Sequence, residues 1–192
     1  MPSFLNLTRI LILINVAVYC LQALTGDLLT YYFGLWPLGS GHFMPWQVLT
    51  YGFLHDPSSI LHIAMNMWAL FIFGQDLERV LGMKRYALLY FISVLTAALT
   101  QMVFTWIAGP PFVPTVGASG AVFGVLLGFA MFFPNRTIVL LIPPIPMPAR
   151  IFVLVYAALE LFLGVTGTQE GVAHFAHLGG LIGAWLFLRY RR

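Results

Sequence analysis

The chain has 192 residues, of which 60% are hydrophobic and only 8% are charged, and its formal net charge is +3. Soluble domains carry about 25% charged residues, so this composition excludes an ordinary soluble protein and indicates a membrane protein. The basic residues are scattered between apolar runs rather than gathered in one patch, which excludes a nucleic-acid-binding surface.

Apolar stretches separated by turn residues and charges follow one another along the chain, and a membrane-spanning helix needs roughly 20 such residues. The pattern predicts an all-α, polytopic membrane protein, a six-transmembrane-helix bundle that forms a single domain over residues 1–192. The predicted spans are 8–24, 60–78, 86–108, 119–133, 149–166 and 172–188.

The basic residues predict the orientation of this bundle. All nine fall on one side of the six-span arrangement, and basic loops stay on the cytoplasmic side, so both termini are expected to be cytoplasmic. The connections on the other side carry Asp27, Asp56 and Glu170 instead. The basic residues are Arg9, Arg79, Lys84, Arg85, Arg136, Arg150, Arg189, Arg191 and Arg192.

The first span begins near Arg9 and ends near Leu24 without a clean small-residue cleavage site, so we interpret it as a retained helix rather than a signal peptide. The connection 25–59 that follows is long and rich in Tyr, Trp and Phe. Such rings suit the headgroup zone, and we expect this loop to lie partly in the membrane interface.

His62 and Asn66 lie four residues apart in the second span and therefore share one face of a helix. This span enters from the outer side, so both side chains are expected near its outer end, where two donors could stabilise an oxyanion. Interhelical hydrogen bonding is the open alternative for the pair. His42 and His55, in the first loop, are expected to be structural.

The predicted fourth span is too short to cross the hydrocarbon core of a membrane. From Ser119 to Pro134 it provides about 22 Å of helix, whereas the hydrocarbon core is about 30 Å thick. Ser119, at its beginning, is therefore expected below the outer surface. The preceding segment, Gly109–Gly117, must then dip into the membrane and line a water-filled cavity.

Ser119 stands between small residues, Gly117 and Gly120, at the start of this short helix. Small neighbours let a substrate backbone approach the hydroxyl, and the helix N-terminus offers N–H groups to an oxyanion. A helix cap is the ordinary role of such a serine. Nucleophilic chemistry would additionally require a nearby base.

His177 supplies a candidate base in the sixth span, where an ionisable residue points to function, although a satisfied polar core residue is the alternative. The fourth and sixth spans both run from outer to inner side, so Ser119 and His177 are expected at comparable depth. Small residues recur every four positions in both spans and allow close packing. Phe123, one turn after Ser119, is placed to stack on the imidazole.

No carboxyl group is predicted to complete a triad, which favours a Ser119–His177 dyad. Glu160, in the fifth span, is expected too deep in the membrane to reach His177 and is expected to meet Thr100 or Gln101 instead. The main chemical alternative is a metal site formed by His62, His174 and His177. No carboxylate motif accompanies these histidines, and we expect neither a metal nor a cofactor.

These motifs together resemble the rhomboid family of intramembrane serine proteases. The segments are His62–Met67 in the second span, Gly117–Gly120 at the nucleophile and His174–Gly180 in the sixth span. The resemblance covers nearly the whole chain. It implies Ser119 as nucleophile, His177 as general base, and an oxyanion hole formed by His62, Asn66 and the Ser119 backbone N–H.

The resemblance also implies transmembrane-helix substrates, cut near the outer membrane face. From its short length and single domain, the chain is expected in a bacterial cell (inner) membrane. An inactive, membrane-helix-binding relative is the alternative function. The chain departs from the family pattern at Gln47, where many members have arginine, at the inserted Asp56-Pro57 pair, and at Phe123, which is often tyrosine. Gln47 leaves the anchoring of the first loop in question.

Overall fold

The computed structural model describes residues 6–109, 113–139, 144–167 and 172–190 of the chain, and most of them are helical. Glu170, Arg191 and Arg192, which entered the orientation prediction, lie outside the described residues. The elements are α1 (Leu7–Thr25), α2 (Leu28–Phe33), α3 (Gln47–Thr50), η1 (Tyr51–Phe53), α4 (Ile60–Ala69), η2 (Leu70–Gly74), α5 (Gln75–Leu81), α6 (Met83–Ala108), α7 (Ser119–Phe132), β1 (Thr137–Val139), β2 (Pro146–Pro148), α8 (Ala149–Thr166) and α9 (His174–Tyr190).

Every predicted span is a helix, with ends within three residues of the predicted ones. The second span is continuous from Ile60 to Leu81 and contains one π-helical turn, η2. Together with α1, α6 and α8 it is long and apolar enough to cross a membrane, whereas α7 is a shorter apolar helix of 14 residues. The protein is thus an all-α polytopic membrane bundle, and the count of six spans remains a prediction.

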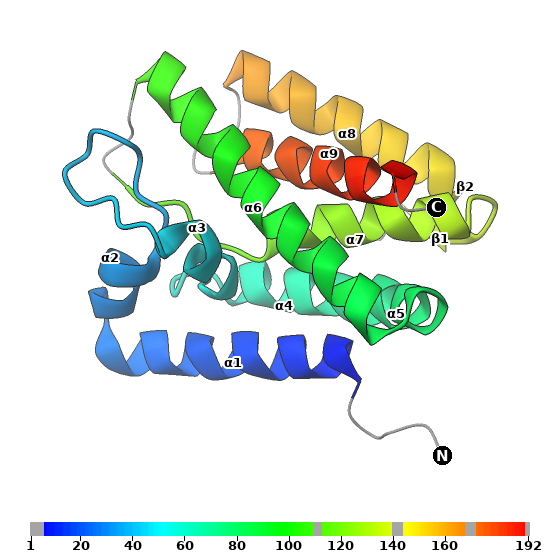
Figure 1. Ribbon diagram of the computed structural model, residues 1–192, viewed down its shortest axis with the longest axis horizontal. Coiled ribbons are helices and arrows are strands. Elements are labelled where there is room, and N and C mark those ends of the chain that lie inside the picture. The colour runs from blue at the N-terminus through cyan, green and yellow to red at the C-terminus, as the bar shows by residue number, and fades with distance from the viewer. Residues whose placement is uncertain (1–5, 110–112, 140–143, 168–171, 191–192) are drawn as a thin grey trace.

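The helices form a bundle in which α1 and α8 lie on opposite sides and α4, α7 and α9 lie between them (Figure 1). The long helix α6 crosses this set and packs on both α7 and α9. Helices α6, α7 and α9 bury small and apolar residues against one another, so the centre of the molecule is where α7 and α9 meet.

Large apolar side chains cover the outside of the bundle, as expected where lipid rather than water surrounds a protein. They lie on the outer helices and on the outward face of α6. Examples are Leu13, Leu24, Ile60, Leu99, Val103, Ile107, Leu154, Phe162 and Val165.

Gln47 anchors the first loop, which answers the question raised by its difference from the family pattern. Its buried side chain makes four hydrogen bonds to backbone groups. Oε1 accepts from the N–H groups of Trp36 (3.3 Å) and Met44 (3.1 Å), and Nε2 donates to the carbonyl oxygens of Tyr32 (3.3 Å) and His42 (3.2 Å). One amide therefore ties together the turns that precede α3.

Glu78, on α5, fixes the beginning of α1. Its carboxylate accepts hydrogen bonds from the N–H groups of Leu7 (2.7 Å) and Thr8 (2.9 Å) and from the Thr8 hydroxyl (2.7 Å). The first N–H groups of a helix have no partner inside the helix, and a carboxylate at this end is favoured by the helix dipole. This contact joins the first and second spans at the end of the bundle away from Ser119.

Candidate active site

Ser119 and His177 are in contact. The sequence predicted only that they lie at comparable depth in the membrane. Ser119 is the first residue of α7, and His177 lies in the first turn of α9. Ser119 Oγ and His177 Nε2 are 2.7 Å apart. A hydroxyl within hydrogen-bond reach of an imidazole nitrogen is the arrangement in which histidine can take the hydroxyl proton.

Glycines allow α7 and α9 to approach closely enough for this contact. The α9 backbone at Gly180 lies directly against the Gly120 carbonyl oxygen of α7, so that a Cβ on Gly180 would overlap it. A Cβ on Gly120 would in turn stand 2.5 Å from Cβ of Ala97 on α6. The predicted small-residue packing of these two spans is therefore observed.

Phe123 stacks on the His177 ring, as its position one turn after Ser119 predicts. The ring centroids are 4.5 Å apart and the planes are inclined by 7°. The Phe123 ring also lies near Tyr156 of α8, with 6.3 Å between the ring centroids. The imidazole is thus held on one face by an aromatic ring from the helix that carries Ser119.

Glu160 contacts the second ring nitrogen of His177, Nδ1. The expectation that Glu160 lies too deep in the membrane to reach His177 is therefore wrong. Glu160 Oε2 is 2.8 Å from Nδ1 of His177 and 2.6 Å from Nδ1 of His174. No hydrogen bond joins Glu160 to Thr100 or Gln101 among the described residues, so that predicted pairing is also wrong. All three groups are buried.

The error lies in the depth assigned to Glu160, because the fifth span was predicted to end at residue 166, where α8 does end. Helix α8 ends at Thr166, so Glu160 lies six residues, or about 9 Å, below its end. His177 lies three residues, or about 4.5 Å, below the beginning of α9. A glutamate side chain bridges that difference in depth. The general rule that an ionisable residue within a span marks function would have identified Glu160 as a site residue.

His62 lies next to this pair, and Asn66, one turn later, shares the same face of α4. A Cβ added to Gly117 would stand 3.0 Å from His62 Nε2 and 3.5 Å from Ser119 Oγ, so both atoms border the space that Gly117 leaves open. Gly117 has a φ of +134°, which side-chain-bearing residues rarely adopt. Glycine is thus required here by backbone conformation and by space.

The hydrogen bonds of the α4 residues indicate which donors remain for a ligand. His62 Nδ1 accepts from the Asp56 N–H at 3.4 Å, which leaves the proton of a neutral ring on Nε2, the nitrogen beside Gly117. Asn66 Nδ2 donates one hydrogen to the His62 carbonyl oxygen at 2.9 Å. An amide NH₂ carries two hydrogens, so a second one is left.

His55 supports His62 from the loop before α4, in the structural role expected for it. It is fully buried, its ring meets that of His62 at 5.1 Å, and its backbone N–H donates to Gln22 Oε1 at 3.0 Å. Burial, together with the nearby His62, lowers the pKa of His55 to about 3. The other loop histidine, His42, packs in an aromatic cluster with Tyr31 and Trp36.

The three histidines of the alternative metal site are not brought together. Within the described part of the chain, the one cluster of metal-ligand type joins Glu160, His174 and His177 and leaves out His62. The expectation that no carboxylate accompanies the histidines is therefore wrong. A tetrahedral zinc ion with bonds of about 2.0–2.1 Å would hold its ligand atoms about 3.3 Å apart. The 2.6 and 2.8 Å separations fit hydrogen bonds instead.

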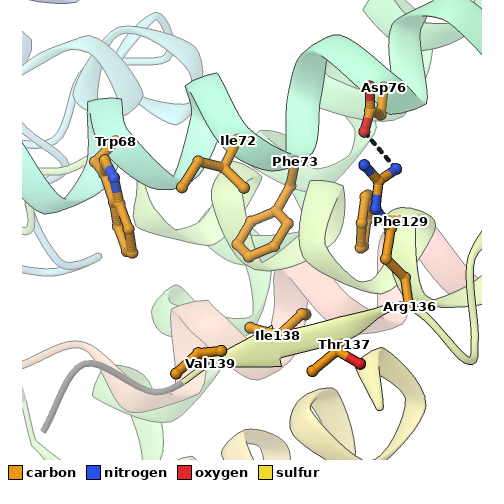
Figure 2. A pocket seen from close by; sticks show the side chains of 9 residues that line it. All are labelled: Trp68, Ile72, Phe73, Asp76, Phe129, Arg136, Thr137, Ile138 and Val139. Carbon is orange, nitrogen blue, oxygen red and sulfur yellow. Dashed lines mark hydrogen bonds and ion pairs between the residues drawn. The ribbon is translucent and has the colours of Figure 1, made fainter. Parts of the chain in front are cut away.

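A cavity of about 210 Å³ opens at the far end of α7 from Ser119 (Figure 2). Its walls are mostly apolar, and an ion pair of Arg136 with Asp76, 2.7 Å between Nη1 and Oδ2, closes one side. None of the predicted site residues lines it. The lining residues are Trp68, Ile72, Phe73, Asp76, Phe129, Arg136, Thr137, Ile138 and Val139.

Comparison with known proteins gives consistent matches. Residues 42–191 match the family model of the rhomboid domain. The chain is 31% identical over 188 residues to Rhomboid protein 1, mitochondrial, of Saccharomyces cerevisiae, which covers 91% of this chain and 50% of that protein. It is 32% identical over 142 residues to Rhomboid protease GluP of Bacillus subtilis, covering 73% of this chain and 25% of the relative.

A third relative is Rhomboid protease GlpG of Yersinia pestis, 30% identical over 180 residues, which is 92% of this chain and 59% of that protein. The chain thus spans between 25% and 59% of the length of these curated relatives.

Proposed function

The chain belongs to the rhomboid family, and from this membership we propose that it is an intramembrane serine endopeptidase that acts through Ser119 and His177. The observation that carries the proposal is the 2.7 Å contact between Ser119 Oγ and His177 Nε2. Substrates are transmembrane proteins, whose helices are cut near the outer membrane face.

In the proposed reaction, Ser119 Oγ attacks the carbonyl carbon of the scissile peptide bond while His177 Nε2 takes the hydroxyl proton. The tetrahedral intermediate collapses when the carbon–nitrogen bond breaks and His177 returns the proton to the leaving amine. Water then attacks the acyl-enzyme with His177 again as base, which releases the acid product and restores Ser119.

The oxyanion of the intermediate needs donors on the side of Gly117. We assign this role to the Ser119 backbone N–H, to His62 Nε2–H and to the free hydrogen of Asn66 Nδ2. The position of His62 Nε2, 3.0 Å from where a Gly117 Cβ would lie, supports the assignment. Removing one such donor from a serine protease costs about 10²- to 10³-fold in rate.

The neighbouring residues keep the pair in place. Phe123 and His174 limit the motion of the His177 and Glu160 side chains, and Gly117 and Gly120 leave room for substrate and for helix packing. The proposed mechanism needs no metal or cofactor. We further propose a bacterial cell membrane location and, on the basis of the distribution of basic residues, six spans with both termini in the cytoplasm.

Cleavage of a transmembrane substrate in liposomes tests the proposal. The purified protein is mixed with a fluorescent single-span substrate, and the parent is compared with Ser119→Ala. Serine and alanine differ by one oxygen atom, so the fold should survive the change. Cleavage by the parent and none by the variant is expected. Equal cleavage by both proteins would refute the assignment of Ser119, and binding without cleavage by the parent would favour the membrane-helix-binding alternative.

A further inference from the structure

The buried carboxylate of Glu160 contacts the same imidazole that contacts Ser119. One oxygen, Oε2, lies 2.8 Å from His177 Nδ1, while His177 Nε2 lies 2.7 Å from Ser119 Oγ. The three side chains therefore form a continuous chain of hydrogen bonds from α8 through α9 to α7. Helix packing holds the three side chains in place.

The carboxylate determines which ring nitrogen of His177 carries the proton. An ionised carboxylate only accepts hydrogen bonds, so Nδ1 must be the donor. In a neutral imidazole this leaves Nε2 unprotonated, with its lone pair towards Ser119. A general base needs its lone pair on that nitrogen, and the wrong tautomer removes most of the activity of a serine protease.

We propose that Glu160 is a positioning residue that completes a Ser119–His177–Glu160 triad, an inference that rests on the proposed protease function. Glu160 holds His177 in the reactive tautomer. It also stabilises the imidazolium that forms when His177 takes the Ser119 proton. A negative charge 2.8 Å from that cation is most effective where little water is present, and Glu160 is only 8% exposed.

His174 and Gly164 keep Glu160 in this position. His174 lies three residues before His177 on the same face of α9 and donates to the same oxygen at 2.6 Å. Gly164 lies one turn after Glu160 on α8, and a Cβ there would stand 3.1 Å from the His174 Cβ and 3.0 Å from the Phe175 ring. The small residue thus brings α8 close to α9 at the level of the carboxylate.

The test compares Glu160→Gln with the parent in labelling by a serine-reactive fluorophosphonate. Glutamine keeps the shape and an acceptor oxygen but removes the charge. We expect the maximal labelling rate to fall by up to about 10⁴-fold, the loss found when the acid of a serine protease triad is changed. The probe concentration at half-maximal rate should stay within about twofold, because Glu160 does not touch the probe. Glu160→Asp, which restores the charge, should recover part of the rate.

Glu78→Gln is the matched control, since it also removes a buried carboxylate that accepts several hydrogen bonds, but at the other end of the bundle. It should lower thermal stability without changing the labelling rate of the folded protein. Labelling of Glu160→Gln at the parental rate would overturn the triad. Loss of labelling in both variants at equal folded fraction would overturn it as well, because the loss would then not be specific to the carboxylate beside His177.

Measurements on the parent keep the proposal testable if Glu160→Gln does not fold. Nitrogen-15 NMR of labelled histidines in micelles should identify His177 as the Nδ1–H tautomer, and an Nε2–H tautomer would overturn the proposal. If a chelator abolishes labelling and zinc restores it, the three groups are metal ligands and the proposal is likewise overturned. A parent that is neither labelled nor cleaves substrate refutes the protease function itself, whereas a labelled parent with an equally labelled Glu160→Gln refutes only the triad.

Discussion

Substitution of Gly180 by alanine should separate Ser119 from His177 without touching either residue. Gly180 lies three residues after His177 on α9, and Gly120 follows Ser119 on α7. A Cβ on Gly180 would overlap the Gly120 carbonyl oxygen, which is backbone and cannot rotate away. The two helices must therefore move apart at the level of the site.

The size of the effect follows from the contact distances. Carbon and carbonyl oxygen approach to about 3.3 Å in close helix packing, so α7 and α9 must separate by about 1.4 Å. The hydrogen bond between Ser119 Oγ and His177 Nε2 would then lengthen from 2.7 Å to a value outside the range of about 2.6–3.2 Å that proton transfer needs. A misplacement of this size costs about 10²-fold in rate.

The assay is the rate of fluorophosphonate labelling, measured beside thermal unfolding of the same preparation. Gly128→Ala is the control, because its Cβ would meet only the flexible ends of Leu77, Leu89 and Leu188, the nearest at 2.7 Å, far from the site. Overpacking there should cost about 1–3 kcal/mol of stability and leave the labelling rate unchanged. Labelling of folded Gly180→Ala within twofold of the parent would refute the reasoning.

Three further changes test other parts of the structure. Gln47→Ala leaves buried backbone groups of the first loop without partners and should lower the free energy of unfolding by about 2–3 kcal/mol. Denaturant titration measures this change, and an unchanged free energy would contradict the anchoring role of Gln47. A substrate helix must enter the bundle from the side to reach Ser119, and we propose that it enters beside α8. Phe152→Ala removes a buried ring of α8 that stacks on Tyr156 at 4.6 Å, and should speed cleavage of helical substrates by loosening this entry. Unchanged rates would count against the entry route. Burial holds the pKa of His55 at about 3 in the folded protein, against about 6.5 in the unfolded chain. The contribution of the neutral His55 ring to stability is therefore complete above pH 6.5. It declines by about 1.4 kcal/mol per pH unit as the pH falls towards 3. His55→Phe should therefore lose stability less steeply than the parent between pH 6.5 and 4, and parallel curves would refute the assignment.

The apolar runs were sufficient to predict the helices, because a span in lipid must satisfy its backbone hydrogen bonds within one helix. Each span therefore appears in the sequence as one continuous apolar stretch. The contact of Phe123 with His177 was likewise predictable, since it depends on spacing within one helix and on a single helix pair. The short helices α2 and α3 in the first loop were not predicted. They depend on contacts such as those of Gln47, which join turns that are distant in sequence.

The position of Glu160 could not be derived by counting residues from an assumed membrane surface. The end of α8 at Thr166 was predicted correctly, but which faces of α8 and α9 meet depends on the packing at Gly164. The sequence does contain the relevant signal, namely three ionisable residues in two neighbouring spans, with His174 and His177 on one helix face. Only the packed structure shows that one carboxylate oxygen serves both histidines.

The most direct test of the account is fluorophosphonate labelling of the purified parent beside Ser119→Ala and His177→Ala. The account predicts that the parent alone is labelled, because only Ser119 paired with His177 is nucleophilic enough to react. Labelling of Ser119→Ala, or a folded parent that is not labelled at all, would contradict the assignment of Ser119 and His177 as the reactive pair.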